Sequence, residues 1–265
     1  MSKLKIIGES KTSFGHYINT YNGCAHSCVY CYAKGIAHRD SVQWRQATPR
    51  VSFIENLKKD IELLKQNPSL REGINDIWVS SFTDCYQPLE KENHATRQTL
   101  ELLIANELPF TVLTKNALVL EDLNLLKGYP KCRVGLTLTT LDETYRQYLE
   151  PYTSTTDEKI VALETLKANG VSTYCSVEPI TSKLSDPVAI VKRLAEVMDL
   201  FEFGVWNEKY HIPGLNYDEP YLMGELDKVM TYCRNSKIKH CTAGHSEDKL
   251  LDYDLPFIPS SMFIP

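Results

Sequence analysis

Short apolar stretches alternate with longer amphipathic stretches along most of this chain. The apolar stretches predict strands at 18–21, 74–82, 110–114, 134–140, 171–180 and 201–206, with a shorter one at 238–242. The amphipathic stretches predict helices at 54–66, 89–106, 120–127, 156–169, 185–199 and 218–235. Strands separated by helices of this length are typical of βαβ units and a parallel sheet. These strands are too few for a closed eight-stranded barrel. We therefore expect an α/β fold, an open and partial (β/α)6 TIM-like barrel.

The chain is long enough to bury a core of its own, and it contains no repeat, low-complexity tract or linker. We expect a single domain over residues 1–265, with its core at about 15–245 and the tail 246–265 packed on the barrel. No apolar run reaches the about 18 residues of a membrane-spanning helix, and residues 1–15 lack the apolar core of a signal peptide. We expect a cytoplasmic protein without a membrane partner.

The charge of the chain bears on its partners. The formal net charge is −5, and no Lys/Arg stripe is visible in the sequence. Proteins that bind nucleic acid through phosphate contacts usually carry a basic surplus. A large nucleic-acid substrate is therefore disfavoured, although a local basic groove would be compatible with an acidic total.

Three of the eight cysteines, Cys24, Cys28 and Cys31, lie within eight residues of one another. Thiolates are the preferred ligands of iron–sulfur clusters, and three of them can bind three irons of a [4Fe–4S] cube. The fourth iron can then chelate the amino and carboxylate groups of S-adenosylmethionine (SAM). A structural zinc site would need a fourth ligand, often in a second C-x2-C pair, and an electron-transfer ferredoxin would need a fourth cysteine at a suitable spacing.

The segment YNGCAHSCVYCYA at 21–33 resembles the signature of the radical SAM superfamily. This resemblance implies a [4Fe–4S] cluster and SAM as cofactors, a 5′-deoxyadenosyl radical as the reactive species, and Tyr30 packed near the adenine. The surroundings resemble the spore photoproduct lyase-like branch, through SFTDCYQPLE at 81–90, TR at 96–97, LTKN at 113–116 and LEP at 149–151. The likeness covers about residues 15–180.

Further ligand residues are expected where strands end, because ligands of parallel α/β folds sit at the carboxyl ends of the strands. The resemblance implies that Thr83, Lys115 and Thr137 contact SAM. Thr139 shares a strand face with Thr137 and is a fourth candidate. For these residues a surface lysine and ordinary strand threonines are the plainer interpretations.

Two carboxylates follow strands and have more than one possible role. Glu178, before Pro179, is a candidate for binding SAM ribose or a substrate N–H, or for capping a helix. Asp84 is a candidate substrate ligand or a turn-forming residue. The strand end 204–213 also suggests a pocket, with Trp206 stacking on a flat heterocycle and Asn207 and Glu208 binding its polar edge. A core tryptophan in front of a charged turn is the alternative.

The predicted substrate depends on the spore photoproduct lyase-like branch that the chain resembles and on one residue that differs from the repair lyase. The repair lyase of this branch uses a cysteine as hydrogen donor where this chain has Ser81, and only Cys85 or Cys175 could replace it. We predict a lyase acting on a small heterocycle, resembling queuine lyases, which cut a C–N bond of queuine and release 7-aminomethyl-7-deazaguanine for tRNA queuosine salvage. A photoproduct-repair lyase and a non-catalytic iron–sulfur or zinc module are the alternatives. The expected partners are a deazapurine base and an electron donor such as flavodoxin or ferredoxin.

Overall fold

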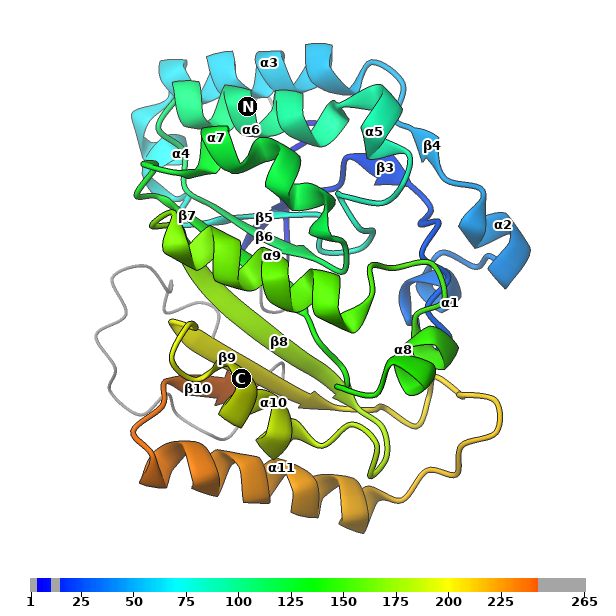
Figure 1. Cartoon of the computed structure of the whole chain (residues 1–265). Helices are drawn as coiled ribbons and strands as arrows, with labels where there is room; N and C mark the ends of the chain where they lie inside the picture. The colour runs from blue at the N-terminus through cyan, green and yellow to red at the C-terminus, as the bar shows by residue number, and fades with distance from the viewer. Residues whose placement is uncertain (1–3, 11–14, 243–265) are drawn as a thin grey trace.

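The computed structural model describes residues 4–10 and 15–242, and its central element is one eight-stranded sheet in the order β1-β2-β5-β6-β7-β8-β9-β10 (Figure 1). Its strands are β1 (Gly8–Glu9), β2 (His16–Ile18), β5 (Ile77–Val79), β6 (Phe110–Thr114), β7 (Cys132–Thr137), β8 (Ser172–Ile180), β9 (Leu200–Val205) and β10 (His240–Thr242). From β2 to β10 every neighbouring pair is parallel, and β1 joins the edge antiparallel to β2. A small ribbon pairs β3 (Tyr21–Asn22) with β4 (Thr48–Pro49). The parallel α/β prediction is confirmed.

Helices cover one face of this sheet, as Figure 1 shows for α3, α6, α9, α10 and α11. The helices are α1 (Ala33–Ile36), α2 (Ser41–Arg45), α3 (Phe53–Gln66), α4 (Pro68–Glu72), α5 (Glu90–Asn93), α6 (Ala95–Ala105), the 3-10 helix η1 (Ala117–Asp122), α7 (Leu123–Leu126), α8 (Glu143–Leu149), α9 (Thr156–Ala168), α10 (Pro187–Leu194) and α11 (Glu219–Asn235). Their apolar stripes pack on the sheet; α3, for example, buries Phe53, Leu57, Ile61 and Leu64 at helical spacing.

The two faces of the sheet bury different side chains, because successive residues of a strand point to opposite faces. Val112, Val134 and Phe203 belong to the large cluster beneath the helices. Trp78 and Tyr174 belong to a separate cluster on the other face. A sheet with helices outside and its own packed interior is the arrangement of a partial TIM-like barrel.

The predicted elements differ from the structure mainly where the backbone turns. The single helix predicted at 89–106 is two helices, because His94 takes a left-handed conformation at φ 49°. The short helices α1, α2, α4 and α8 were not predicted, since four to seven residues carry too little periodicity to stand out. The predicted tail 246–265 lies outside the described residues, and the single-domain division stays a prediction. Within the described chain, no helix is long and apolar enough to cross a membrane.

Candidate active site

The three cysteines lie in a loop between β3 and α1, at the carboxyl ends of the parallel strands (Figure 1). Cys24 and Cys28 are 9% and 8% exposed, and Cys31 is half-buried. The Cys24 amide donates to the carbonyl of Trp44 at 2.9 Å. Gly23 precedes it at φ +80°, where a Cβ atom would lie 2.6 Å from that carbonyl oxygen. The tight entry to the loop therefore requires glycine at this position.

Side chains distant in sequence fix the same loop. The Gln87 amide accepts from the Ala25 N–H at 2.8 Å and donates to the Gly23 carbonyl at 3.2 Å. The buried Glu90 accepts from the Tyr21 hydroxyl, and also from the backbone N–H of Thr96 at 3.0 Å. Both residues come from the 81–90 segment, although sequence reasoning gave them no role. Their hydrogen bonds hold the loop backbone in one conformation.

His26 lies inside the loop, fully buried, with its Nδ1 3.2 Å from Oδ2 of Asp84. Asp84 is engaged at both oxygens, accepting from the Thr114 hydroxyl (2.7 Å), the Tyr86 N–H (2.9 Å) and the Lys115 N–H (2.8 Å). Burial alone would raise the pKa of Asp84, but His26 and these donors lower it to about 2. We therefore revise the expected role of Asp84: its carboxylate ties the cysteine loop to β6 and has no free oxygen for a substrate.

The donor set suits a [4Fe–4S] cluster better than a single metal ion. Each cysteine of a cube binds a different iron, whereas zinc draws all its ligands to one point. Among the described residues, no three Cys, His, Asp or Glu side chains converge closely enough to hold one ion. Burial and the nearby Glu150 carboxylate raise the pKa of the Cys28 thiol well above its usual range. Metal ligation requires the deprotonated thiolate, which a bound cluster would stabilise at this position.

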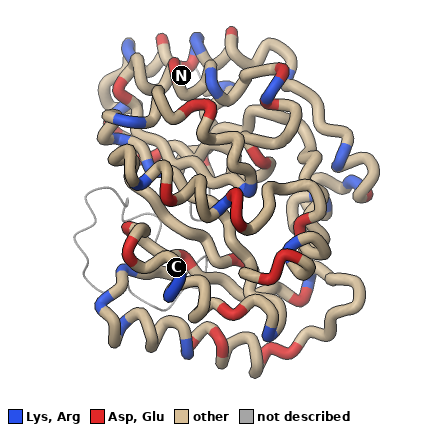
Figure 2. Tube along the Cα trace, viewed as in Figure 1, with Lys and Arg blue, Asp and Glu red and all other residues tan. Residues whose placement is uncertain are grey.

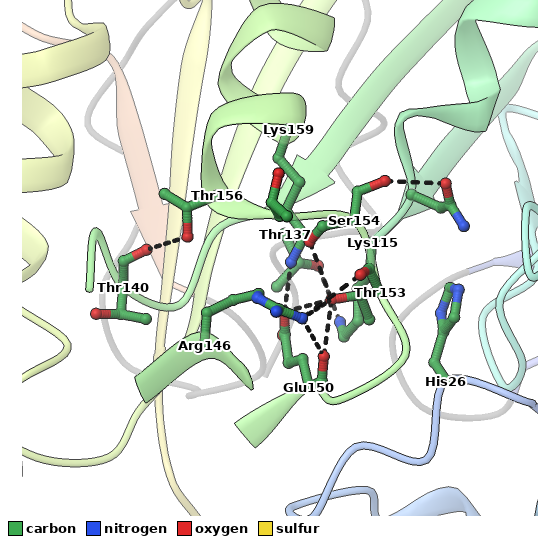
Figure 3. Close-up of polar contacts among 12 residues, drawn as sticks. His26, Lys115, Thr137, Thr140, Arg146, Glu150, Thr153, Ser154, Thr156 and Lys159 are labelled. Atoms are coloured by element: carbon green, nitrogen blue, oxygen red, sulfur yellow. Dashed lines mark hydrogen bonds and ion pairs between the residues drawn. The ribbon is translucent and has the colours of Figure 1, made fainter. Parts of the chain in front are cut away.

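A buried ion pair lies behind the cysteine loop (Figure 3). Glu150 and Lys159 are both fully buried and form this pair, and the Tyr30 hydroxyl donates to the same carboxylate. Arg146 donates to the Glu150 backbone carbonyl at 2.6 Å. Burial would raise the pKa of Glu150, but the ammonium groups of Lys159 and Lys115 outweigh it and lower that pKa. The network fixes Tyr30, the residue implied to pack against adenine.

The expected SAM contacts come together above the same opening. The Lys115 ammonium donates to the Thr137 hydroxyl at 3.0 Å and lies 5.8 Å from the ring centre of Tyr30. The hydroxyls of Thr83 and Thr139 are buried and have no hydrogen-bond partner among the described residues. Buried polar groups are nearly always paired in folded proteins. Unpaired hydroxyls at two of the expected contact positions therefore fit a polar ligand such as SAM.

Glu178 projects from β8 into the barrel interior, where its carboxyl group lies against Gly204 of β9. A Cβ atom at Gly204 would come within 2.7 Å of the Glu178 carboxyl carbon, so glycine makes the space for this side chain. Burial raises the pKa of Glu178, and Lys115 opposes that shift. The next strand carries a second inward carboxylate, Glu202, which sequence reasoning missed. Its signal was a charged residue between Phe201 and Phe203 in an otherwise apolar strand.

The turn at 206–213 approaches the cysteine loop through Tyr210. Trp206 is 3% exposed, packs edge-on against Tyr217 and donates to the Tyr210 carbonyl at 2.7 Å. It is therefore a core residue that anchors the turn, and its stacking role is corrected. Asn207 and Glu208 are exposed. Tyr210, in contrast, lies 6.0 Å between ring centres from Tyr32 of the cysteine loop.

The two cysteines that could replace the missing hydrogen donor are both fully buried in the large hydrophobic cluster. Cys175 follows Tyr174 on β8 and therefore points to the opposite face of the sheet, away from the barrel interior. Cys85 follows Asp84 in the loop after β5.

Residues 18–186 match the family model of the radical SAM superfamily, and the chain belongs to this superfamily. The resemblance to the cysteine signature is thereby confirmed, together with the [4Fe–4S] cluster and SAM as the cofactors that the family uses. The chain is similar to an uncharacterized protein of Methanocaldococcus jannaschii, at 30% identity over 78% of each chain.

Two solved structures share the fold. One is spore photoproduct lyase complexed with dinucleoside spore photoproduct, with a TM-score of 0.66 and 16% identity over 90% of this chain and 78% of that one. The other is SuiB of Streptococcus suis bound to S-adenosylmethionine, with a TM-score of 0.65 and 15% identity over 86% of this chain. This chain covers 50% of the length of SuiB.

Proposed function

We propose that this protein is a radical SAM lyase that cleaves a C–N bond in a small heterocyclic substrate, with queuine as the specific candidate. The observation that carries the proposal is the Lys115 ammonium, which lies between Tyr30 of the cysteine loop and the Thr137 hydroxyl at the end of β7. When bound, the cluster and SAM supply a 5′-deoxyadenosyl radical that abstracts hydrogen from substrate.

The protein's own groups bind and orient in this proposal. Cys24, Cys28 and Cys31 would hold the cluster, and because the motif offers only three thiols, one iron would remain available to SAM. Lys115 binds the SAM carboxylate in this proposal. Its ammonium stays charged, because the negative charge of Glu150 and of neighbouring groups raises the pKa of Lys115 on balance. Burial by itself would lower that pKa, so the surrounding negative groups are what preserve the charge.

Replacing Lys115 with Met is expected to weaken SAM binding by about tenfold or more, because a charge-assisted hydrogen bond contributes roughly 1.5–3 kcal/mol. Equilibrium dialysis of SAM against the cluster-loaded variant measures the change. Lys127→Met, at an exposed position, is the matched control and should bind SAM as the wild type does. If Lys115→Met bound SAM with the affinity of the wild type, Lys115 would not be a SAM-binding residue.

A small substrate is favoured over a nucleic acid by the distribution of charge. Figure 2 shows Lys and Arg interspersed with Asp and Glu, without a continuous basic stripe on the described chain in this view. The photoproduct-repair alternative draws on the shared fold with spore photoproduct lyase. It is disfavoured here, because Ser81 stands at the position of the donor cysteine and Cys175 points away from the barrel interior.

The reaction is tested by reconstituting the protein anaerobically with iron and sulfide, reducing it, and adding SAM with and without queuine. The expected result is 5′-deoxyadenosine formation that queuine stimulates, with release of 7-aminomethyl-7-deazaguanine. If SAM is cleaved but queuine remains intact, the queuine assignment fails and DNA containing the photoproduct is the next substrate. If SAM is not cleaved at all, the radical mechanism itself is rejected.

A further inference from the structure

Two carboxylates, Glu178 and Glu202, lie on the inner face of two adjacent strands, and neither forms an ion pair within the described residues. Glu178 lies on β8 and Glu202 on the adjacent β9, where Glu202 is in register with Ser176. Both are half-buried, so they stay accessible from the barrel interior. Within the described ranges, no ion pair of 4.0 Å or less involves either carboxylate.

These carboxylates interact unfavourably in the empty barrel. Burial, together with the charge of Glu178, raises the pKa of Glu202 to about 8. Lys115 opposes the shift at Glu178, and a hydrogen bond from Ser176 together with the charge of Arg133 opposes the shift at Glu202, but neither shift is cancelled. Two like charges in a partly desolvated site are stabilised only by a counter-charge or by proton uptake.

A third polar group in the same interior also lacks a partner. Tyr174, two residues before Ser176 on β8, is 2% exposed, and its hydroxyl has no hydrogen-bond partner among the described residues. Its ring lies across Gly135, where a Cβ atom would come within 2.4 Å of the ring carbon that carries the hydroxyl. After burial, Glu202 is the group that acts most strongly on this phenol. Glycine therefore makes room for an unpaired hydroxyl on the same face of the sheet as the two carboxylates.

We infer that Glu178 and Glu202 bind a cationic nitrogen group of the substrate, an amine or amidinium carrying N–H donors, with the Tyr174 hydroxyl as a neighbouring hydrogen-bonding group. A cation with several N–H groups supplies both the missing counter-charge and the missing hydrogen bonds. The inference rests on the proposed function in one respect, that the barrel interior takes a small substrate. It adds the chemical class of that substrate and a residue, Glu202, outside the predicted site.

The inference is tested with two probes of the same shape, benzamidine, which is cationic, and benzamide, which is neutral. Ligand-observed NMR titrations are run on the full, cluster-loaded chain. The wild type should bind benzamidine more tightly than benzamide. Glu202→Gln should weaken benzamidine binding about tenfold, corresponding to 1.4 kcal/mol, with little effect on benzamide. Glu72→Gln, on the exposed surface of α4, is the matched control.

Thermal unfolding separates recognition from folding. Because Glu202→Gln removes one of two repelling carboxylates, its melting temperature should equal or exceed that of the wild type, while its affinity for benzamidine should fall. Glu178→Gln is the second variant and should act in the same direction. Equal preference for benzamidine in the wild type and in both variants would overturn the inference.

The same samples distinguish the inference from the proposed reaction. If benzamidine preference is lost in Glu202→Gln while the wild type leaves queuine intact, the cation site is supported and the queuine assignment fails. If the wild type cleaves queuine and Glu202→Gln does so at an equal rate with unchanged KM, the reaction stands and the cation site is rejected.

Discussion

Replacing Cys24 with Ala is expected to abolish SAM cleavage, leaving 5′-deoxyadenosine at the background level after anaerobic reconstitution. Two thiolates cannot hold a [4Fe–4S] cluster that is designed for three protein ligands and one open iron. The buried loop supplies no replacement thiol, because Cys85 lies in the outer core and is fully buried there. Iron and sulfide analysis, the visible absorption of the cluster, and mass spectrometry of 5′-deoxyadenosine measure the effect.

Cys233→Ala is the control for this experiment, because Cys233 lies on α11, in the outer core and outside the cysteine loop. It should keep its iron and its SAM cleavage, with only the modest loss of stability of a small core truncation. A Cys24→Ala protein that retained about four irons and cleaved SAM would show that another residue completes the cluster. The cysteine assignment would then be wrong.

Replacing Glu150 with Gln is expected to destabilise the protein by about 3–5 kcal/mol. The buried Lys159 ammonium would lose its only ion-pair partner within the described chain, and an uncompensated buried charge is costly. Such a loss is a large part of the about 5–15 kcal/mol that holds a typical domain folded. Urea unfolding of the full chain under anaerobic conditions measures the shift in midpoint.

The double variant Glu150→Gln/Lys159→Met tests the reason for this loss. Removing both partners leaves the Lys159 position without an uncompensated charge, so the double variant should be more stable than Glu150→Gln alone. Glu62→Gln breaks the exposed pair with Lys65 and should cost less than about 1 kcal/mol. If the double variant were the less stable one, packing would be the main contribution of these side chains, and the charge argument would fail.

The same network also affects the cofactor site, since the Glu150 carboxylate accepts from Tyr30. The sequence placed Tyr30 correctly within the cysteine motif, but nothing in the motif indicates what holds its ring. The acceptor is 120 residues away in the sequence. Gln87, which binds the loop backbone at Ala25, is 62 residues away. Local patterns carry no information about such pairings.

The predicted substrate pocket shows a second limit of local reasoning. Trp206, Asn207 and Glu208 follow a strand, which correctly indicated the mouth of the barrel. Because ligands lie at the carboxyl ends of parallel strands, such a position predicts the end of the sheet but not the direction of each side chain. In addition, the bulge between Val177 and Ile180 shifts the register of β8 against β9. Trp206 consequently packs into the core, whereas Tyr210 reaches the cysteine loop.

The sequence by itself determined the family, its cofactors and the alternation of strands and helices. Each of these depends on residues close together in the chain, namely three thiols within one loop and the alternation of apolar and amphipathic stretches. The tertiary structure alone decided which polar side chains meet inside the barrel. Glu178 and Glu202 belong to different strands, and only parallel pairing of β8 with β9 turns both toward one interior. Burial there changes their protonation and leaves them without a cation, which no linear pattern expresses.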